Sequence, residues 1–201
     1  WGYSESPTVD GDKLLVTPGG SKGAIVALNK KTGAKLWQSK KLKDAAEYSA
    51  VVVANVDGQR QYIQLFMNTL AGVDAANGNL IWKSDWPQGR TAVIPTPIYR
   101  DGHVFMTSGY RAGARLVKLN GKKAEVVWEN QEMINHHGGV ILVGDHVYGF
   151  SDQRKGNLMC IEFMTGKVAW MERVERELHK GAVHAADGML YCLNETEGWV
   201  Y

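Results

Sequence analysis

The stretch "ALNKKTGAKLW" at residues 27–37 decides the fold, because its pattern returns three times further along the chain. The other copies are "GVDAANGNLIW" at 72–82, "VKLNGKKAEVVW" at 117–128 and "CIEFMTGKVAW" at 160–170. Each copy ends in tryptophan, and successive tryptophans are 45, 46 and 42 residues apart. Self-similarity at a period of roughly 40–50 residues indicates a repeat protein, in which each repeat is one supersecondary unit.

The copies share an apolar residue nine positions before the tryptophan: Leu28, Val73, Leu119 and Ile161. In three copies a Thr-Gly or Asn-Gly pair stands four residues before the tryptophan, at Gly33, Gly78 and Gly166. We expect these glycines to adopt positive φ in a tight turn, where a Cβ would be strained. In the third copy Gly121 comes three places earlier, so a different turn is expected there.

A second series of turns runs in phase with the first. Asp-Gly or Gly-Asp pairs separate extended runs in "VDGDKLLVT", "RDGHVFMTS", "VGDHVYGFS" and "ADGMLYCLN". Such pairs between β-rich segments are strong hairpin signals, and no stretch of the chain has a convincing helical periodicity. Each period therefore reads as four short antiparallel strands, which is typical of a β-propeller blade.

The sequence thus predicts an all-β protein, a β-propeller with four complete four-stranded antiparallel blades plus part of a fifth. The repeats are expected in a single domain at roughly 1–44, 45–88, 89–133, 134–178 and 179–201, the last one incomplete. A sheet face this small needs a large apolar side chain to bury against the next blade. Four residues are expected to occupy equivalent, largely buried docking sites between blades: Trp37, Trp82, Trp128 and Trp170.

The pattern AL(N/D)xxTGxxxW resembles the pyrroloquinoline-quinone (PQQ) type repeat of quinoprotein alcohol dehydrogenases and of the scaffold lipoprotein in outer-membrane β-barrel assembly. The opening "WGYSESPTVDGDKLLVTPGG", together with "GRTAVIPTPIYRDG" and "NHHGG", looks like the large group of bacterial PQQ-like propellers. The resemblance covers the whole chain. It implies a ring of seven or eight blades, of which this chain is about half, in a periplasmic or exported protein. Several unrelated activities share the repeat, so it does not imply one function.

Composition narrows the classes of partner. The 201 residues carry a net charge of only +2, which does not indicate a nucleic-acid partner. Hydrophobic residues make up 44% and charged residues 22% of the chain, as in ordinary globular proteins. No apolar run approaches the roughly 20 residues that a membrane-spanning helix needs. The chain begins at Trp1 without methionine, so we expect a processed or truncated N-terminus.

The candidate site follows from blade topology. With strands A to D numbered outward from the axis, the D-to-A and B-to-C loops share one face, called here the loop face. The tight A-to-B and C-to-D turns share the opposite face, called here the turn face. Binding residues concentrate on loops that a rigid scaffold holds, so a ligand is expected at the loop face. The candidate ligand-binding residues all come from D-to-A loops: His136, His137, Arg90, Thr91, Tyr48 and Lys180.

The adjacent histidines allow two interpretations, a structural role for both or a ligand pocket lined by one. Successive residues of an extended segment point to opposite sides, so we expect the imidazoles of His136 and His137 to diverge. A metal ion held by both is disfavoured for that reason, and no metal site is predicted. If one histidine lines a pocket, binding there could depend on pH near neutrality.

Three functions remain open. The first is a non-catalytic binding or scaffold module in the bacterial cell envelope, holding a protein or polymer partner as well as the remaining half of the propeller. The second is a quinoprotein alcohol dehydrogenase that uses PQQ and calcium, although the chain has neither a Cys-Cys pair nor a calcium-binding set that can be matched. The third is a hydrolase or lyase with a loop-face site. G-x-S-x-G, H-E-x-x-H and P-loop motifs are absent, so no catalytic residue is assigned and no cofactor is evident.

Overall fold

The computed structural model of the chain describes residues 4–87, 92–152, 157–172, 180–196 and 198–201. The described residues contain no helix, and their strands form five antiparallel sheets that follow one another along the chain. Four sheets have four strands each, and the fifth has two. The prediction of an all-β propeller with four complete blades and part of a fifth is confirmed, whereas the exact repeat boundaries stay a prediction.

The strands are short, as expected for propeller blades. The first sheet contains β1 (Thr8–Asp10), β2 (Lys13–Val16), β3 (Val26–Asn29) and β4 (Lys35–Gln38). The second contains β5 (Val52–Val56), β6 (Gln59–Leu65), β7 (Leu70–Asp74) and β8 (Leu80–Ser84). The third contains β9 (Ile98–Arg100), β10 (His103–Ser108), β11 (Gly113–Asn120) and β12 (Lys123–Asn130). The fourth contains β13 (Val140–Val143), β14 (His146–Ser151), β15 (Asn157–Glu162) and β16 (Val168–Met171). The fifth contains β17 (Gly181–Ala186) and β18 (Met189–Asn194).

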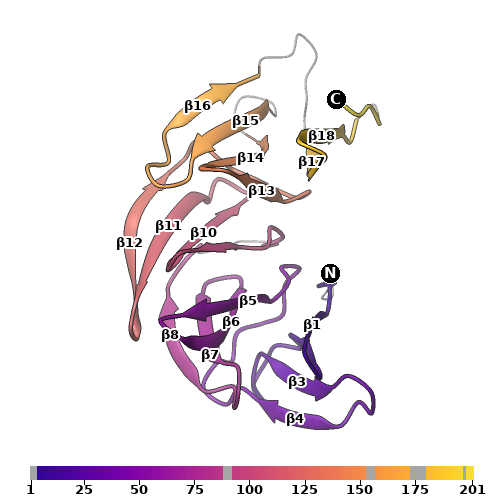
Figure 1. The fold of residues 1–201 in the computed structure, drawn as a ribbon, viewed down its shortest axis with the longest axis vertical. Coiled ribbons are helices and arrows are strands. Elements are labelled where there is room, and N and C mark those ends of the chain that lie inside the picture. The colour runs from indigo at the N-terminus through magenta and orange to yellow at the C-terminus, as the bar shows by residue number, and fades with distance from the viewer. Residues whose placement is uncertain (1–3, 88–91, 153–156, 173–179, 197) are drawn as a thin grey trace.

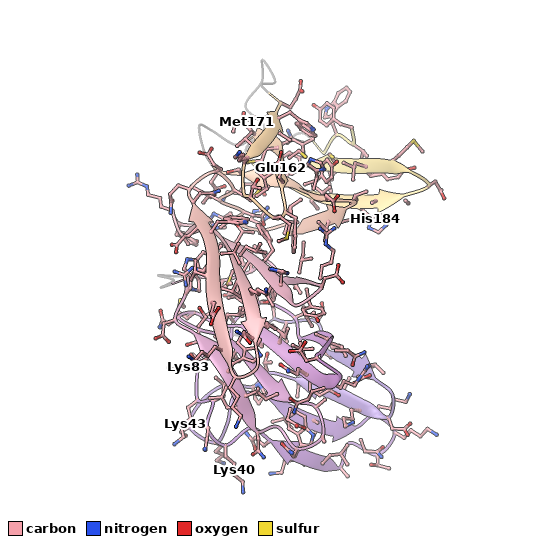
Figure 2. The ribbon with its side chains drawn as sticks, turned by 60° about the vertical axis from the view of Figure 1, so that its left-hand side comes forward. Lys40, Lys43, Lys83, Glu162, Met171 and His184 are labelled. Atoms are coloured by element: carbon pink, nitrogen blue, oxygen red, sulfur yellow. The ribbon has the colours of Figure 1, made fainter. Side chains whose placement is uncertain are left out.

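The sheets stand side by side along an arc (Figure 1). Within each sheet the strands are paired in chain order, so the first strand lies on the concave side of the arc and the fourth on the convex side. Figure 2 shows the two ends of the arc, with His184 on the fifth sheet at one end and Lys40 and Lys43, just after the first sheet, at the other.

The C-to-D turns are built as the sequence predicts in three sheets. Gly33, Gly78 and Gly166 have φ of +72°, +73° and +69°. In the first sheet Gly33 donates its N–H to the carbonyl of Asn29, and the Asn29 side chain accepts two further backbone N–H groups of the turn. A short polar side chain at this position stabilises the turn locally, which explains why Asn or Asp follows the apolar residue in the first two repeats.

The third sheet departs from this plan. Its β11 and β12 are eight residues long, and Asn120 pairs with Lys123 around a two-residue turn that contains Gly121. Gly121 therefore does not occupy the turn position of the other glycines, as expected. The nine-position alignment is wrong in this repeat, because Trp128 pairs with Leu116, twelve positions before it, whereas the other three tryptophans pair with the residue ten positions before them.

The four tryptophans nevertheless occupy equivalent positions. Each ends a row of paired residues that crosses its sheet, called here a tryptophan row, and a register irregularity follows each row. The rows are Thr8–Leu15–Ala27–Trp37, Val52–Ile63–Gly72–Trp82, Ile98–Phe105–Leu116–Trp128 and Ile141–Tyr148–Cys160–Trp170. The four tryptophans therefore hold equivalent positions in the backbone of their sheets.

The apolar core lies between sheets. One cluster joins Leu15 of the first sheet to Tyr62 of the second, and another joins Trp82 of the second sheet to Val104 of the third. A third cluster joins Phe105 to residues of the fourth sheet. The last cluster, between the fourth and fifth sheets, has only Phe150 and Cys192 as buried members. The fold is therefore held by interfaces between neighbouring sheets, as in other repeat proteins.

Burial differs among the four tryptophans although their register is the same. Trp82 is 2% exposed, Trp37 and Trp128 are partly buried, and Trp170 is 40% exposed. The expectation of a largely buried site is therefore wrong for Trp170. Trp82 is covered by the β11–β12 hairpin of the next sheet. The described fifth sheet has two strands and offers no such hairpin to cover Trp170.

Candidate functional site

The segment between β12 and β13 crosses from the convex to the concave side of the arc and carries both candidate histidines. Two buried hydroxyl groups anchor it. Thr107 at the end of β10 donates to the carbonyl of Met133 and accepts the N–H of Asn135, at 3.0 and 3.1 Å. Ser151 at the end of β14 accepts the N–H of Ile134 at 2.9 Å. The segment is thus fixed to the ends of two neighbouring B strands before the histidines are reached.

His136 lies between the third and fourth sheets. Its Nδ1 is 2.9 Å from Oδ2 of Asp152, which directly follows β14. Its ring centroid is 4.4 Å from that of Tyr110, which lies in the loop after β10. The His136 side chain is 16% exposed. A carboxylate on one ring nitrogen selects the tautomer and the orientation of an imidazole, so His136 is held in one position.

His137 reaches the fifth sheet instead. Its Nε2 is 3.0 Å from Oε2 of Glu195, whose backbone N–H donates to the carbonyl of Lys180. The two imidazole centroids are 5.6 Å apart at an interplanar angle of 70°. The expected divergence is therefore wrong. The chain bends at His137 and Gly138, and the alternation of side chains holds only in an extended segment.

The structure brings together part of the predicted set. Glu195 bonds both to His137 and to the backbone carbonyl of Lys180, and the ring of His136 lies beside that of His137. Tyr48 lies between the first and second sheets, where its N–H donates to the carbonyl of Val93, and it takes no part in this junction. Two predicted residues, Arg90 and Thr91, lie outside the described residues. Ligand binding by any of these residues stays a prediction.

Three members of the site were missed by sequence reasoning: Tyr110, Asp152 and Glu195. Each stands immediately or almost immediately after a B strand, namely β10, β14 or β18. The available signal was therefore positional, a polar or aromatic residue that opens a B-to-C loop. We call the five residues Tyr110, His136, His137, Asp152 and Glu195 the histidine cluster.

The histidine cluster offers both donors and acceptors within one surface that spans three sheets. Each imidazole is oriented by a carboxylate, and Tyr110 adds an aromatic ring that is 44% exposed. Such an arrangement can recognise a polar ligand by hydrogen bonds or move a proton at an imidazole. In the described part of the chain, no group of three or more His, Cys, Asp and Glu side chains is arranged to hold a metal ion.

Two carboxyl groups near the first two sheets, Glu47 and Asp10, have pKa values shifted in opposite directions. On the loop face Glu47 is buried and accepts the N–H of Val93 at 3.2 Å, and burial raises the pKa of its carboxyl group. On the turn face Asp10 accepts from Arg60 and from the hydroxyl of Tyr62 in the second sheet. The hydrogen bond from Arg60 lowers the pKa of Asp10 to about 2.

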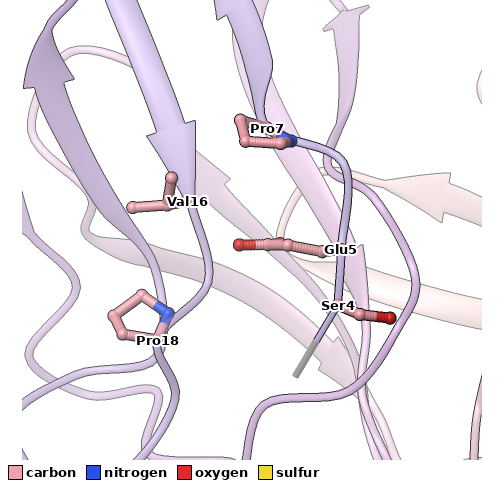
Figure 3. A pocket seen from close by; sticks show the side chains of 5 residues that line it. All are labelled: Ser4, Glu5, Pro7, Val16 and Pro18. Atoms are coloured by element: carbon pink, nitrogen blue, oxygen red, sulfur yellow. The ribbon is translucent and has the colours of Figure 1, made fainter. Parts of the chain in front are cut away.

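A cavity of about 360 Å³ lies beside the first sheet and is lined by Ser4, Glu5, Pro7, Val16 and Pro18 (Figure 3). Its lone carboxylate, Glu5, accepts from both the backbone N–H and the hydroxyl of Thr17. The carboxylate is thus used within the protein, and the rest of the lining is mostly apolar. This cavity lies far along the chain from the histidine cluster and shares no residue with it.

The arc of sheets and the repeated tryptophan rows define a β-propeller of the PQQ-repeat class. The family model described as outer membrane protein assembly factor BamB matches residues 2–172, so the chain belongs to this family.

Solved structures agree on the fold. BamB from Moraxella catarrhalis is 17% identical with a TM-score of 0.64, over 97% of this chain and 61% of that one. Quinohemoprotein alcohol dehydrogenase from Comamonas testosteroni is 13% identical with a TM-score of 0.61, over 100% of this chain and 44% of that one. The computationally designed Ika8 protein is 13% identical with a TM-score of 0.62, over 96% and 56%.

The chain spans less than two thirds of the length of each of these structures. A comparison with curated proteins gave no match. No helix long and apolar enough to cross a membrane occurs among the described residues.

Proposed function

We propose that the chain is a non-catalytic binding or scaffold module of the bacterial cell envelope, periplasmic or otherwise exported. It uses the loop face or the exposed strand edges to hold a protein or polymer partner. The family match over residues 2–172 carries this proposal, because it relates most of the chain to an assembly factor rather than to an enzyme.

The histidine cluster supports a binding role. Both imidazoles are engaged by carboxylates from neighbouring sheets, at 2.9 Å for His136 and 3.0 Å for His137. The cluster thereby links loops of the third, fourth and fifth sheets into one surface. A surface made from several rigid blades keeps its shape when a partner binds, which reduces the entropic cost of association.

Further propeller blades are the first partner that we propose. The fifth sheet continues the tryptophan rows with His184 and Tyr191, which pair with each other and are both exposed. In the first three sheets the residue at the Tyr191 position is fully buried by the next sheet: Leu15, Ile63 and Phe105. An additional sheet on this face would bury the row in the same way.

Site-specific photo-crosslinking in the cell envelope tests the proposal. A photoreactive residue replaces Arg111 on the loop face, Leu36 on the outermost strand of the first sheet, or Lys122 on the turn face. We expect discrete crosslinked species from Arg111 or Leu36 and none from Lys122, which is the matched control. The same pattern at all three positions, or no crosslink at any of them, contradicts the proposal.

A quinoprotein alcohol dehydrogenase is the second candidate, favoured by the fold shared with the Comamonas enzyme. PQQ across the axis would need calcium ligands on the concave side. Glu47 is the buried carboxylate of that region, and it is bonded to Val93 rather than grouped with other acidic side chains. The described residues therefore do not fit the group. Titration of the protein with PQQ and Ca²⁺, followed by a dye-linked alcohol oxidation assay, separates this candidate from the first.

A hydrolase or lyase is the third candidate, and the His136–Asp152 pair is the observation that favours it. An imidazole oriented by a carboxylate can act as a general base. Loss of a measured hydrolytic or lyase activity on His136→Gln substitution, with unchanged folding, would establish this candidate over the scaffold.

A further inference from the structure

The loop that carries Tyr110 has an unusual backbone. In the described part of the chain, the non-glycine residues with positive φ are Asp57, Asp101, Asp187, Tyr110 and Arg111. Each of the three aspartates precedes a glycine in a two-residue A-to-B turn. Tyr110 and Arg111, with φ of +54° and +66°, stand next to each other, and the residue directly after them is Ala112 rather than glycine. Each such residue costs about 1–3 kcal/mol, and backbone strain of this kind clusters at functional sites.

The strained turn places an aromatic ring on the loop face and fixes it there. Ala112 donates its N–H to the carbonyl of Gly109 at 3.1 Å and closes the turn. The Tyr110 ring then packs against His136 with an interplanar angle of 54°. Gly109 allows this approach, because a Cβ there would lie 2.9 Å from the Cα of His136. The ring is supported on one side and is 44% exposed, so it is a preformed platform.

Hydrogen-bond donors and acceptors both lie beside the Tyr110 ring. Contacts run without interruption from Tyr110 to His136, His137 and Glu195, and Asp152 joins at His136. Each carboxylate reaches its histidine through one oxygen, and the side chains of Asp152 and Glu195 are 27% and 41% exposed. Among the described residues of the cluster, two carboxylates oppose the two imidazoles, so the cluster itself supplies no excess of positive charge for an anionic ligand, and the exposed Arg111 adjoins it beside Tyr110.

From these observations we propose that the histidine cluster binds a neutral glycan. One face of a sugar ring is lined by C–H groups and can stack on an aromatic side chain, while its hydroxyls donate to carboxylates and accept from imidazole N–H. An apolar partner would bury the polar groups of the cluster without replacing their hydrogen bonds, which is costly. The inference rests on the proposed function, since it names a polymer as the partner of the loop face.

Titration of the full-length protein with chitohexaose, cellohexaose, xylohexaose and maltoheptaose, followed by calorimetry, tests this site. We expect at least one of these neutral oligosaccharides to bind, and Tyr110→Gly to weaken that binding by about tenfold or more. Glycine removes the ring and tolerates the positive φ at this position, so this variant is expected to keep the fold. Tyr110→Phe keeps the ring and should bind nearly as the parent does.

The control is Val126→Ala, which changes an exposed side chain on β12 at the convex side and should leave binding unchanged. Binding of none of the four oligosaccharides overturns the inference, and so does binding that Tyr110→Gly leaves intact. A crosslink from Arg111 to a protein, without binding of any oligosaccharide, overturns the glycan inference and leaves the proposed function standing. Glycan binding without protein crosslinks supports both, because the partner is then the polymer.

Discussion

Trp82 and Trp170 hold the same position in the repeat and lie in different environments. Each pairs with the residue ten positions before it, and a register irregularity follows each pair. Trp82 is 2% exposed and donates its indole N–H to Gln61, within a core shared with the third sheet. Trp170 is 40% exposed and packs beside Tyr148 of its own sheet. The repeat sets where a tryptophan stands, and the neighbouring sheet sets how much the tryptophan stabilises the fold.

The strongest test of this comparison removes each ring in turn. Trp82→Ala should lower the free energy of unfolding by about 3–5 kcal/mol, because it leaves a large cavity in a closed core. Trp170→Ala should lower it by only about 1–2 kcal/mol in this chain, because much of the ring is already in contact with water. Chemical denaturation followed by far-UV circular dichroism measures both. Equal losses would show that packing against the next sheet does not determine how much a tryptophan contributes to stability.

The glycines of the C-to-D turns give a matched test of how a tryptophan packs against the next sheet. Gly78 and Gly33 hold the same position in the C-to-D turns of two different sheets, with φ of +73° and +72°. A Cβ at Gly78 would clash with the Trp37 ring of the preceding sheet, whereas one at Gly33 would meet nothing within 4 Å. Gly78→Ala should therefore cost about 1–2 kcal/mol more than Gly33→Ala, which carries only the strain of positive φ. Thermal denaturation of the two variants measures the difference in stability. Equal stabilities would contradict the packing of Trp37 against the turn of Gly78.

The polar link between the first two sheets should contribute less than a buried tryptophan. Asp10 has a lowered pKa of about 2, with the hydrogen bond from Arg60 as the main cause. Its stabilisation is present above the unfolded-state pKa near 4 and is lost as the pH falls towards 2. Asp10→Asn should cost about 1–2 kcal/mol at neutral pH, since Arg60 is half exposed and the pair is partly screened. Denaturation curves between pH 2 and pH 7 measure the free energy of unfolding of the parent and of Asp10→Asn. The difference in stability between the two should shrink as the pH falls towards 2, because only the parent loses the contribution of Asp10.

The smallest expected effect is at Glu47, where the pH dependence has the opposite sign. Burial raises the pKa of this carboxyl group, so the folded state favours its protonated form. Stability from this group is present below the unfolded-state pKa and is lost as the pH rises through the folded-state pKa. Glu47→Gln keeps an acceptor for the N–H of Val93 and should stabilise the protein by about 1 kcal/mol or less at neutral pH. A destabilised variant at pH 7 would mean that the ionised form is the one the fold needs.

Much of the fold could be predicted because its determinants are local. The glycines at positive φ, the two-residue A-to-B turns and the strand order depend on residues close together in sequence. The third repeat was misaligned because it exchanges a four-residue turn for longer strands and a two-residue turn. Both solutions keep the tryptophan near its usual spacing, so spacing alone could not separate them.

The histidine cluster was predicted only in part, since its partners come from distant segments. His136 and Asp152 are 16 residues apart, and His137 pairs with Glu195, 58 positions further on. A polar residue after a B strand has many possible orientations, and only the curvature of the arc brings three such residues to one junction. For Tyr110 the sequence offered only its position at the start of a B-to-C loop, and its positive φ and its packing against His136 are visible only in the structure.

The sequence by itself therefore determined the class of fold, the four equivalent tryptophans and the face on which function is expected, since periodicity and turn chemistry act over a few residues. The tertiary structure alone decided which tryptophans are buried, which histidine meets which carboxylate and where an aromatic ring stands open to solvent. Burial and pairing depend on the side chains that neighbouring sheets bring together, and those neighbours lie roughly one repeat away along the chain.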